Sequence, residues 1–140
     1  MVKVNAHGIQ GDAARWIRNC LAGRHQLVCI NQSYSNWALV TSGVLQGSVL
    51  GPLLFLIYIN DIDTNIIRKM SKFADNTKLC NRARNPDDIM ELQEDINKLV
   101  EWANKWQMSF NVEKYSVMHI GHNDMKSNYN MSNQQLPTTD

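Results

Sequence analysis

The strongest hydrophobic pattern in the chain lies between residues 86 and 106. Apolar side chains recur there at steps of three and four, at Ile89, Leu92, Ile96, Leu99, Ala103 and Trp106. This spacing puts them on one face of an α-helix. Asn85 is a favourable N-cap, Pro86 suits the first helical position, and Asp87 and Asp88 follow at the positive end of the helix dipole. The pattern favours a helix that packs on a core over a coiled coil, because it lasts less than three heptads.

The N-terminal part of the chain predicts a helix followed by a hairpin. Asp12 is placed to cap a helix that runs to about Leu21 and ends before Gly23. Apolar and β-branched residues then predict two strands, over residues 25–31 and 37–41, with a turn between them.

A glycine-rich loop and a strongly apolar helix come next. Residues 43–51 hold three glycines, which predicts a loop. Pro52 suits the first position of the helix that follows. Residues 53–59 are apolar at nearly every position, so this helix is predicted to be buried on most sides.

The remaining pattern favours strands. Residues 69–74 and 77–82 predict two short strands joined by a two-residue turn at Asp75-Asn76. Residues 115–120 predict one further strand. From residue 122 onward the chain is rich in Asn, Ser and Gln and poor in large apolar residues, so we expect a loose tail. The predicted fold class is α+β.

Composition and charge narrow the class of protein. The chain is 44% hydrophobic and 19% charged, which is typical of a globular domain. Residues 1–84 carry ten Lys/Arg and four Asp/Glu, or +6, whereas residues 85–140 carry four and nine, or −5. A basic half can attract nucleic-acid phosphates, although an ordinary mixed surface explains the charge equally well. With no apolar signal-like start, no membrane-length apolar run and no CxxC pair, we expect an intracellular protein, nuclear or cytoplasmic, without structural zinc.

Two stretches of sequence form recognisable motifs. One is SGVLQGSVLGPLLF at residues 42–55, followed by YIND at residues 58–61, and the other is KFADNTKL at residues 72–79. They resemble the motifs SGVPQGSVLGPLLF…YINDL and KFADDTKL of reverse transcriptases from non-LTR retrotransposons of the LINE or jockey type. Leu45 stands where that family has proline, and Asn76 where it has a second aspartate. The resemblance extends over most of residues 3–121.

This resemblance implies a fold, an activity and a set of site residues. The fold would be a partial polymerase palm over residues 1–121, with 122–140 as the loose tail. The parent activity would be RNA-templated DNA synthesis, with an RNA template, a DNA primer, dNTPs and Mg²⁺ as ligands. By resemblance, Gln46, Gly47 and Ser48 line the groove for template and incoming nucleotide. Judged without the family, they form an ordinary glycine-rich loop.

Two more residues take roles from the resemblance alone. Lys114 stands where the family has a lysine near the phosphates of the nucleotide, a place where a cation helps the leaving group. Phe73 leads into the metal-binding turn, and as a phenylalanine we also expect it to contribute to the core. A surface lysine and a core aromatic residue are the ordinary alternatives.

The metal site is where the chain departs most from the family. Nucleotidyl transfer builds charge on the attacking and leaving oxygens, which two divalent ions about 3.5–4 Å apart stabilise. Mg²⁺ prefers hard oxygen ligands, especially carboxylates. The family uses two adjacent aspartates in the hairpin turn and a third from an earlier strand motif, which has no counterpart in these residues. Asp75 is therefore the one aspartate of the three that remains, because Asn76 is a neutral amide.

Three functions remain open from the sequence. We favour a truncated, catalytically inactive reverse transcriptase-like domain, with at most weak Mg²⁺ binding at Asp75. The alternative is a non-catalytic module that binds nucleic acid or protein, and an active enzyme ranks third. Without the strand that precedes it in the family, the Asp75 hairpin would leave an unpaired sheet edge, so we also expect self-association.

One competing signal belongs to another class of enzyme. His119-Ile120-Gly121-His122 and Lys69-Met70-Ser71-Lys72 resemble the two ATP-binding signatures of class I aminoacyl-tRNA synthetases. Their order is reversed here, and no Rossmann-like unit leads into the first, so this interpretation is weak.

Overall fold

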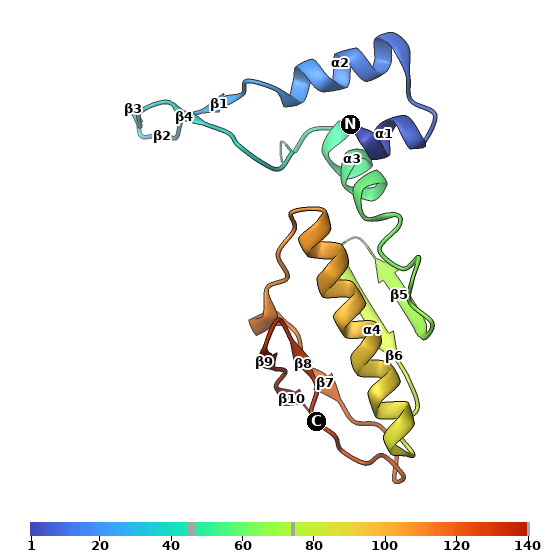
Figure 1. The fold of residues 1–140 in the computed structure, drawn as a ribbon. Helices are drawn as coiled ribbons and strands as arrows, with labels where there is room; N and C mark the ends of the chain where they lie inside the picture. Colours follow the sequence, from blue (N-terminus) through green and yellow to red (C-terminus); the bar gives the residue numbers. More distant parts are fainter. Residues whose placement is uncertain (45–46, 74, 140) are drawn as a thin grey trace. The chain divides into compact units, whose positions relative to one another are not determined.

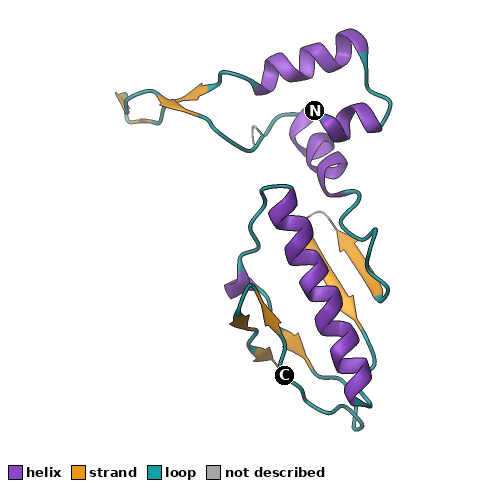
Figure 2. Ribbon diagram, viewed as in Figure 1, coloured by secondary structure: helices purple, strands orange, loops and turns teal. Residues whose placement is uncertain are grey.

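The chain folds into two compact units. The computed structural model describes residues 1–44, 47–73 and 75–139, and it divides the chain into Met1–Asn60 and Asp61–Asp140 (Figure 1). Helices and small, mostly antiparallel strands occur among the described residues of both, in agreement with the α+β class (Figure 2). None of the helices in the described ranges is long and apolar enough to cross a membrane.

Three helices pack together in the first unit. They are α1 (Val2–Ala6), α2 (Gly11–Leu21) and α3 (Leu50–Ile59). Each contributes to one buried cluster, which consists of Val4, Ile17, Leu54 and Ile57. On α3, Leu53 and Leu56 are about half exposed. The prediction that this helix is buried on most sides is confirmed, because its exposed residues, Pro52, Leu53 and Leu56, share one side and the other residues of α3 are buried or partly buried.

The starts of α2 and α3 also differ from the prediction. The residue before α2 is Gln10, and Asp12 lies inside the first turn, where it pairs with Arg15 at 2.8 Å. Its charge still suits the positive end of the helix dipole, but it is not the cap. Pro52 is the third residue of α3 rather than the first.

The predicted hairpin of the first unit is present, but its strands are broken into short pieces, and its second strand begins at Ser33, inside the stretch that was expected to turn. They are β1 (His25–Gln26), β2 (Cys29–Ile30), β3 (Ser33–Tyr34) and β4 (Ala38–Leu39). β1 pairs with β4 and β2 with β3, both antiparallel. Between the two pairings, residues 27–28 lie opposite residues 35–37, so the second strand carries one extra residue, a bulge. At this point the Ser35 hydroxyl accepts a hydrogen bond from the Val28 amide, at 2.9 Å.

The second unit is organised along one long helix, α4 (Pro86–Lys105). The Asn85 side chain accepts a hydrogen bond from the Asp88 amide at 2.7 Å, which confirms the predicted cap. Ile96, Leu99 and Ala103 of the predicted stripe are buried. The hairpin of β5 (Lys69–Phe73) and β6 (Asn76–Cys80) runs alongside this helix (Figure 1).

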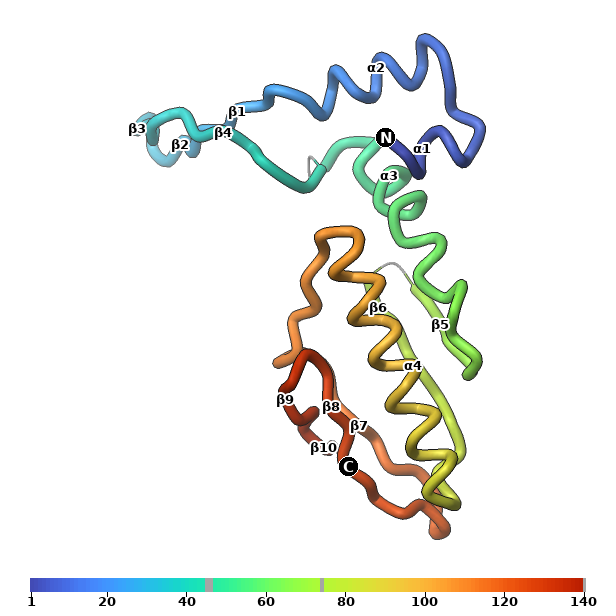
Figure 3. Tube along the Cα trace, viewed as in Figure 1, coloured from blue at the N-terminus to red at the C-terminus, as the bar shows by residue number. Residues whose placement is uncertain are grey.

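The C-terminal segment returns to pack on the same helix. After the short helix η1 (Val112–Lys114), it forms β7 (Val117–Met118), β8 (Asn130–Met131), β9 (Gln134–Gln135) and β10 (Thr138–Thr139). β8 and β9 form an antiparallel hairpin, and β10 pairs with β7 in parallel (Figure 3).

This packing differs from the loose tail that was expected after residue 121. Tyr129, Met131 and Leu136 are buried and form one cluster with Ile96 of α4. The Gln93 side chain also pairs with the backbone of Asn130, with one hydrogen bond in each direction at 2.8 Å. Few large apolar residues occur in this segment, but those three are sufficient to attach it to the core.

Candidate active site

The register of the β5–β6 hairpin places its turn one residue earlier than predicted. The strands pair from Lys69 with Cys80 to Phe73 with Asn76. The two residues between them are therefore 74 and 75, of which Ala74 lies outside the described residues. Asp75 is exposed in the turn, and Asn76 is the first residue of β6. The prediction that Asn76 occupies the turn is corrected by this register.

Alternation along the two strands gives the hairpin an outer and an inner face. Met70, Thr77 and Leu79 on the inner face are partly buried, and Leu79 packs on the cluster of the second unit. Every residue of the outer face is exposed: Lys69, Ser71, Phe73, Asn76, Lys78 and Cys80. Phe73 is 82% exposed, so the expected contribution to the core is wrong.

Asp75 lies within electrostatic range of the segment that carries Lys114. Burial raises the pKa of the Tyr115 phenol, and the negative charge of Asp75 raises it further. Lys114, the last residue of η1, is exposed and precedes Tyr115 directly. The second unit therefore brings together the neighbourhoods of two predicted site residues.

The glycine-rich loop belongs to the first unit. Gln46 lies outside the described residues. Gly47 has a φ of 82°, in the left-handed region that favours glycine, and is exposed. The Ser48 hydroxyl accepts a hydrogen bond from the Gly51 amide at 3.0 Å, so it helps to cap α3. Ser48, which the resemblance places in the groove for template and nucleotide, therefore also has a local structural role.

Arg24 is a residue of this loop region that sequence reasoning missed. Its guanidinium donates to the Gly43 carbonyl at 2.7 Å and to the Leu21 carbonyl at 3.2 Å. It thereby links the end of α2 to the start of the loop. An arginine before a predicted strand gives no sequence signal for such contacts, because its partner Gly43 is nineteen residues away.

Other acidic residues of the second unit have partners of their own. Asp61 accepts a hydrogen bond from the Trp102 indole at 3.1 Å, and Asp63 pairs with Lys72 at 2.9 Å. Across the described ranges, no three His, Cys, Asp or Glu side chains gather in a way that could hold a metal ion.

The two segments that resemble synthetase signatures have structural roles in the second unit. Residues 69–72 lie within β5. His119 pairs with Asp124 at 2.9 Å, and Asp124 also accepts from the Lys126 amide at 2.8 Å. The hydrogen bond from the Lys126 amide lowers the pKa of the Asp124 carboxyl. Burial acts in the opposite direction, and His119 lowers the pKa further. The pair closes a loop after β7.

Comparison with known proteins assigns the family. The family model for reverse transcriptase (RNA-dependent DNA polymerase) matches residues 1–137. The chain is 33% identical, over 104 residues, to a probable RNA-directed DNA polymerase from transposon X-element of Drosophila melanogaster. It is 30% identical, over 112 residues, to the probable RNA-directed DNA polymerase from transposon BS of the same organism. No solved structure gives a significant match.

The chain therefore belongs to the reverse transcriptase family, as the two motifs predicted. Each match covers 70% of this chain but only 12% of the length of the transposon protein. The domain is thus a reverse transcriptase-like domain of retrotransposon type.

Proposed function

We propose that the chain is part of a reverse transcriptase palm whose metal site carries too little charge to polymerise DNA. The observation that carries this proposal is the hairpin of β5 and β6. Asp75 lies in its turn, and the next residue, Asn76, begins β6 as a neutral amide. Family membership supplies the parent activity, which is RNA-templated DNA synthesis.

The residues present do not fit a two-ion Mg²⁺ site. Such a site needs several carboxylate oxygens to neutralise two divalent ions about 3.5–4 Å apart. Asp75 supplies one carboxylate, whereas Asn76 can lend an oxygen but no charge. Asp61 and Asp63 are engaged by Trp102 and Lys72. The purified chain is therefore not expected to catalyse metal-dependent nucleotidyl transfer, and primer extension tests this proposal.

A second candidate function is supported by the outer face of the same hairpin. Phe73 is exposed there at the turn end, Lys69 lies at the opposite end of β5, and Lys78 of β6 pairs with Ser71 between them. Cations can contact phosphates, and an exposed aromatic ring can stack on a base. We propose that this face, with Lys114 of the same unit as a further contact, retains weak binding to a primed RNA template. The template and nucleotide contacts that the resemblance gives to Gln46, Gly47 and Ser48 are a separate proposal for the loop of the first unit.

Filter binding at several salt concentrations tests the retained binding. We expect affinity to fall with salt, and the double change Lys69→Gln with Lys78→Gln to reduce the slope by about 0.7–0.9 per lysine. Phe73→Ala should weaken binding without changing the slope. The matched control is Lys105→Gln on the exposed side of α4. Equal effects of all the lysine changes would show non-specific attraction instead.

Self-association belongs to the same proposal. Among the described residues, β5 and β6 form a two-stranded sheet in which each strand has one edge without a partner strand. Unpaired edges are templates for further strands. We propose that copies of the chain associate through this hairpin at micromolar concentration, and sedimentation velocity before the binding assay distinguishes associated from monomeric chain.

A further inference from the structure

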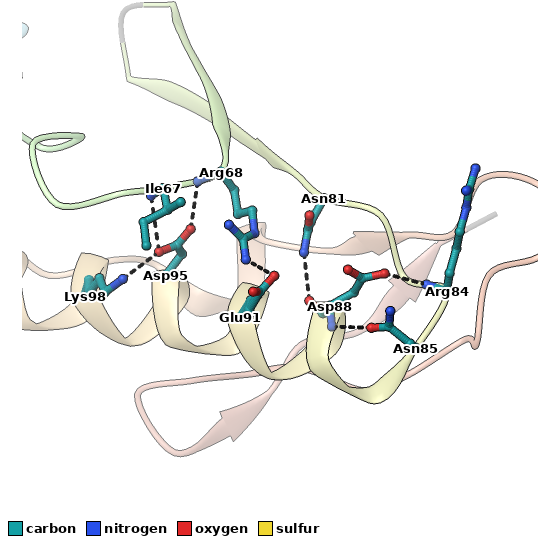
Figure 4. Close-up of polar contacts among 9 residues, drawn as sticks. All are labelled: Ile67, Arg68, Asn81, Arg84, Asn85, Asp88, Glu91, Asp95 and Lys98. Atoms are coloured by element: carbon teal, nitrogen blue, oxygen red, sulfur yellow. Dashed lines mark hydrogen bonds and ion pairs between the residues drawn. The ribbon is translucent and has the colours of Figure 1, made fainter.

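Asp95 is the most deeply buried charged side chain among the described residues. It lies in the middle of α4 and is 1% exposed. A buried carboxylate is very costly unless hydrogen bonds compensate it. Asp95 accepts from the Lys98 ammonium at 2.9 Å, from the Arg68 amide at 3.0 Å and, more weakly, from the Ile67 amide at 3.5 Å (Figure 4).

These donors keep Asp95 ionised. Burial alone would raise its pKa, but the Lys98 ammonium and the two backbone amides outweigh burial and leave the pKa below its usual value. The charge is therefore present at neutral pH. Two of its hydrogen bonds go to residues that directly precede β5, so Asp95 connects the helix to the entry of the hairpin.

The hairpin is attached to α4 at its exit as well. The Asn81 side chain, just after β6, donates to the Asp88 carbonyl at 2.7 Å. The Asp88 carboxylate accepts from the Arg84 amide at 3.1 Å. At the entry, the Arg68 guanidinium also pairs with Glu91 (Figure 4). One helix thus holds both ends of the segment that carries Asp75.

We infer that Asp95 is a positioning residue, which fixes the entry of the β5–β6 hairpin on α4 and thereby the place of Asp75. The hairpin depends on this attachment because an isolated two-stranded hairpin is marginally stable. Its outer face is exposed, and its inner face is only partly buried. The importance of this positioning for catalysis rests on the proposed function, because Asp75 has a catalytic role only if the chain is part of a polymerase palm.

The first test is hydrogen exchange of Asp95→Asn in the full chain, with Glu94→Gln, an exposed neighbour on α4, as the matched control. Loss of the charge should reduce protection of the amides from residue 67 to residue 73 about tenfold or more, because hydrogen bonds to charged groups are the stronger ones. Leu99 and Ala103 should keep their protection. Equal loss along the whole of α4, or no difference from Glu94→Gln, would overturn the inference.

The second test measures where Asp75 lies. In the wild-type chain, Asp75→Asn should lower the pKa of Tyr115, because it removes one of the two causes that raise it. In an Asp95→Asn background this decrease should shrink, since the turn is no longer held in place. An unchanged decrease would contradict a positioning role. Neither hydrogen exchange nor the pKa of Tyr115 depends on polymerisation. Failure of the proposed function in primer extension can therefore be distinguished from failure of this inference.

The pH profile keeps the inference testable if Asp95→Asn fails to fold. A carboxyl whose pKa is lowered by folding contributes stability above its unfolded value of about 3.9, and this is lost as the pH falls through the folded value. The charged group that contacts Asp95 is the Lys98 ammonium, whereas Arg68 contributes its backbone amide and pairs its guanidinium with Glu91. After correction for intrinsic rates, hairpin amides of wild-type chain should lose protection on acidification before those of α4. Simultaneous loss would refute the inference.

Discussion

Deletion of residues 122–140 should abolish cooperative unfolding of the second unit. Tyr129, Met131 and Leu136 are each at most 6% exposed and pack on Ile96. Burying one such side chain stabilises a fold by about 1.5–3 kcal/mol, and a whole domain is stable by only about 5–15 kcal/mol. The deletion also removes the Gln93 contacts and the partner of β7. Thermal unfolding followed by circular dichroism should show a broad change in place of a sharp transition.

Point variants distinguish the loss of buried side chains from the effect of shortening the chain on stability. Leu136→Ala should cost about 2–5 kcal/mol, because it leaves a cavity in the cluster. Gln135→Ala, at the exposed neighbouring position, should change stability by less than about 0.5 kcal/mol. If the truncated chain unfolds as sharply and at the same temperature as the full chain, the core of the second unit is complete without residues 122–140, which would contradict this prediction.

Asn76→Asp should raise the affinity of the hairpin turn for Mn²⁺ or Mg²⁺ by about tenfold or more, because ligand charge governs the affinity of such sites. The change puts a second carboxylate beside Asp75, which is exposed in the turn. It should not produce polymerisation, since Asp61 and Asp63 are held by other side chains. Calorimetry with Mg²⁺ and electron paramagnetic resonance with Mn²⁺ measure the affinity.

Two further variants identify the source of the gain. Asp75→Asn in the Asn76→Asp chain should return the affinity to the wild-type level. Asn104→Asp adds the same charge at an exposed position near the end of α4 and should leave metal binding unchanged. A gain as large from Asn104→Asp would show that overall charge, rather than the turn, attracts the ion.

Elements with local signals could be predicted well. The helix from Pro86 has its cap, its acidic first turn and its apolar stripe within twenty residues, and the structure matches it to within one residue. The two hairpins follow from alternating patterns and turn residues. The family could be predicted because its motifs are short, contiguous stretches of sequence.

What could not be predicted depends on distant partners. The apolar residues 53–59 indicate a helix, but its exposed side follows from which elements pack against it. Leu136 is an apolar residue in a largely polar segment, and its burial depends on the cluster that it forms with Ile96 of α4. The contact of Asp95 with Arg68 spans 27 residues, so no local sequence pattern near either residue predicts it.

The candidate site shows the same limit. The motif identified Asp75 correctly as a turn residue, but a one-residue error in the register misplaced Asn76. The core role of Phe73 was expected from its residue type alone, and the structure exposes it. In a two-stranded hairpin, register decides which face each side chain occupies. The contribution of Asp75 to the pKa of Tyr115 links segments forty residues apart, which no local pattern indicates.

Primer extension tests the central claim most directly. Purified chain would be incubated with a primed RNA template and dNTPs in Mg²⁺ or Mn²⁺, beside an active reverse transcriptase as positive control. We predict no extension above background for the wild-type chain and none for Asn76→Asp. Template-dependent product from the wild-type chain that disappears in Asp75→Ala would contradict the claim, because it would show that this hairpin still supports a working metal site.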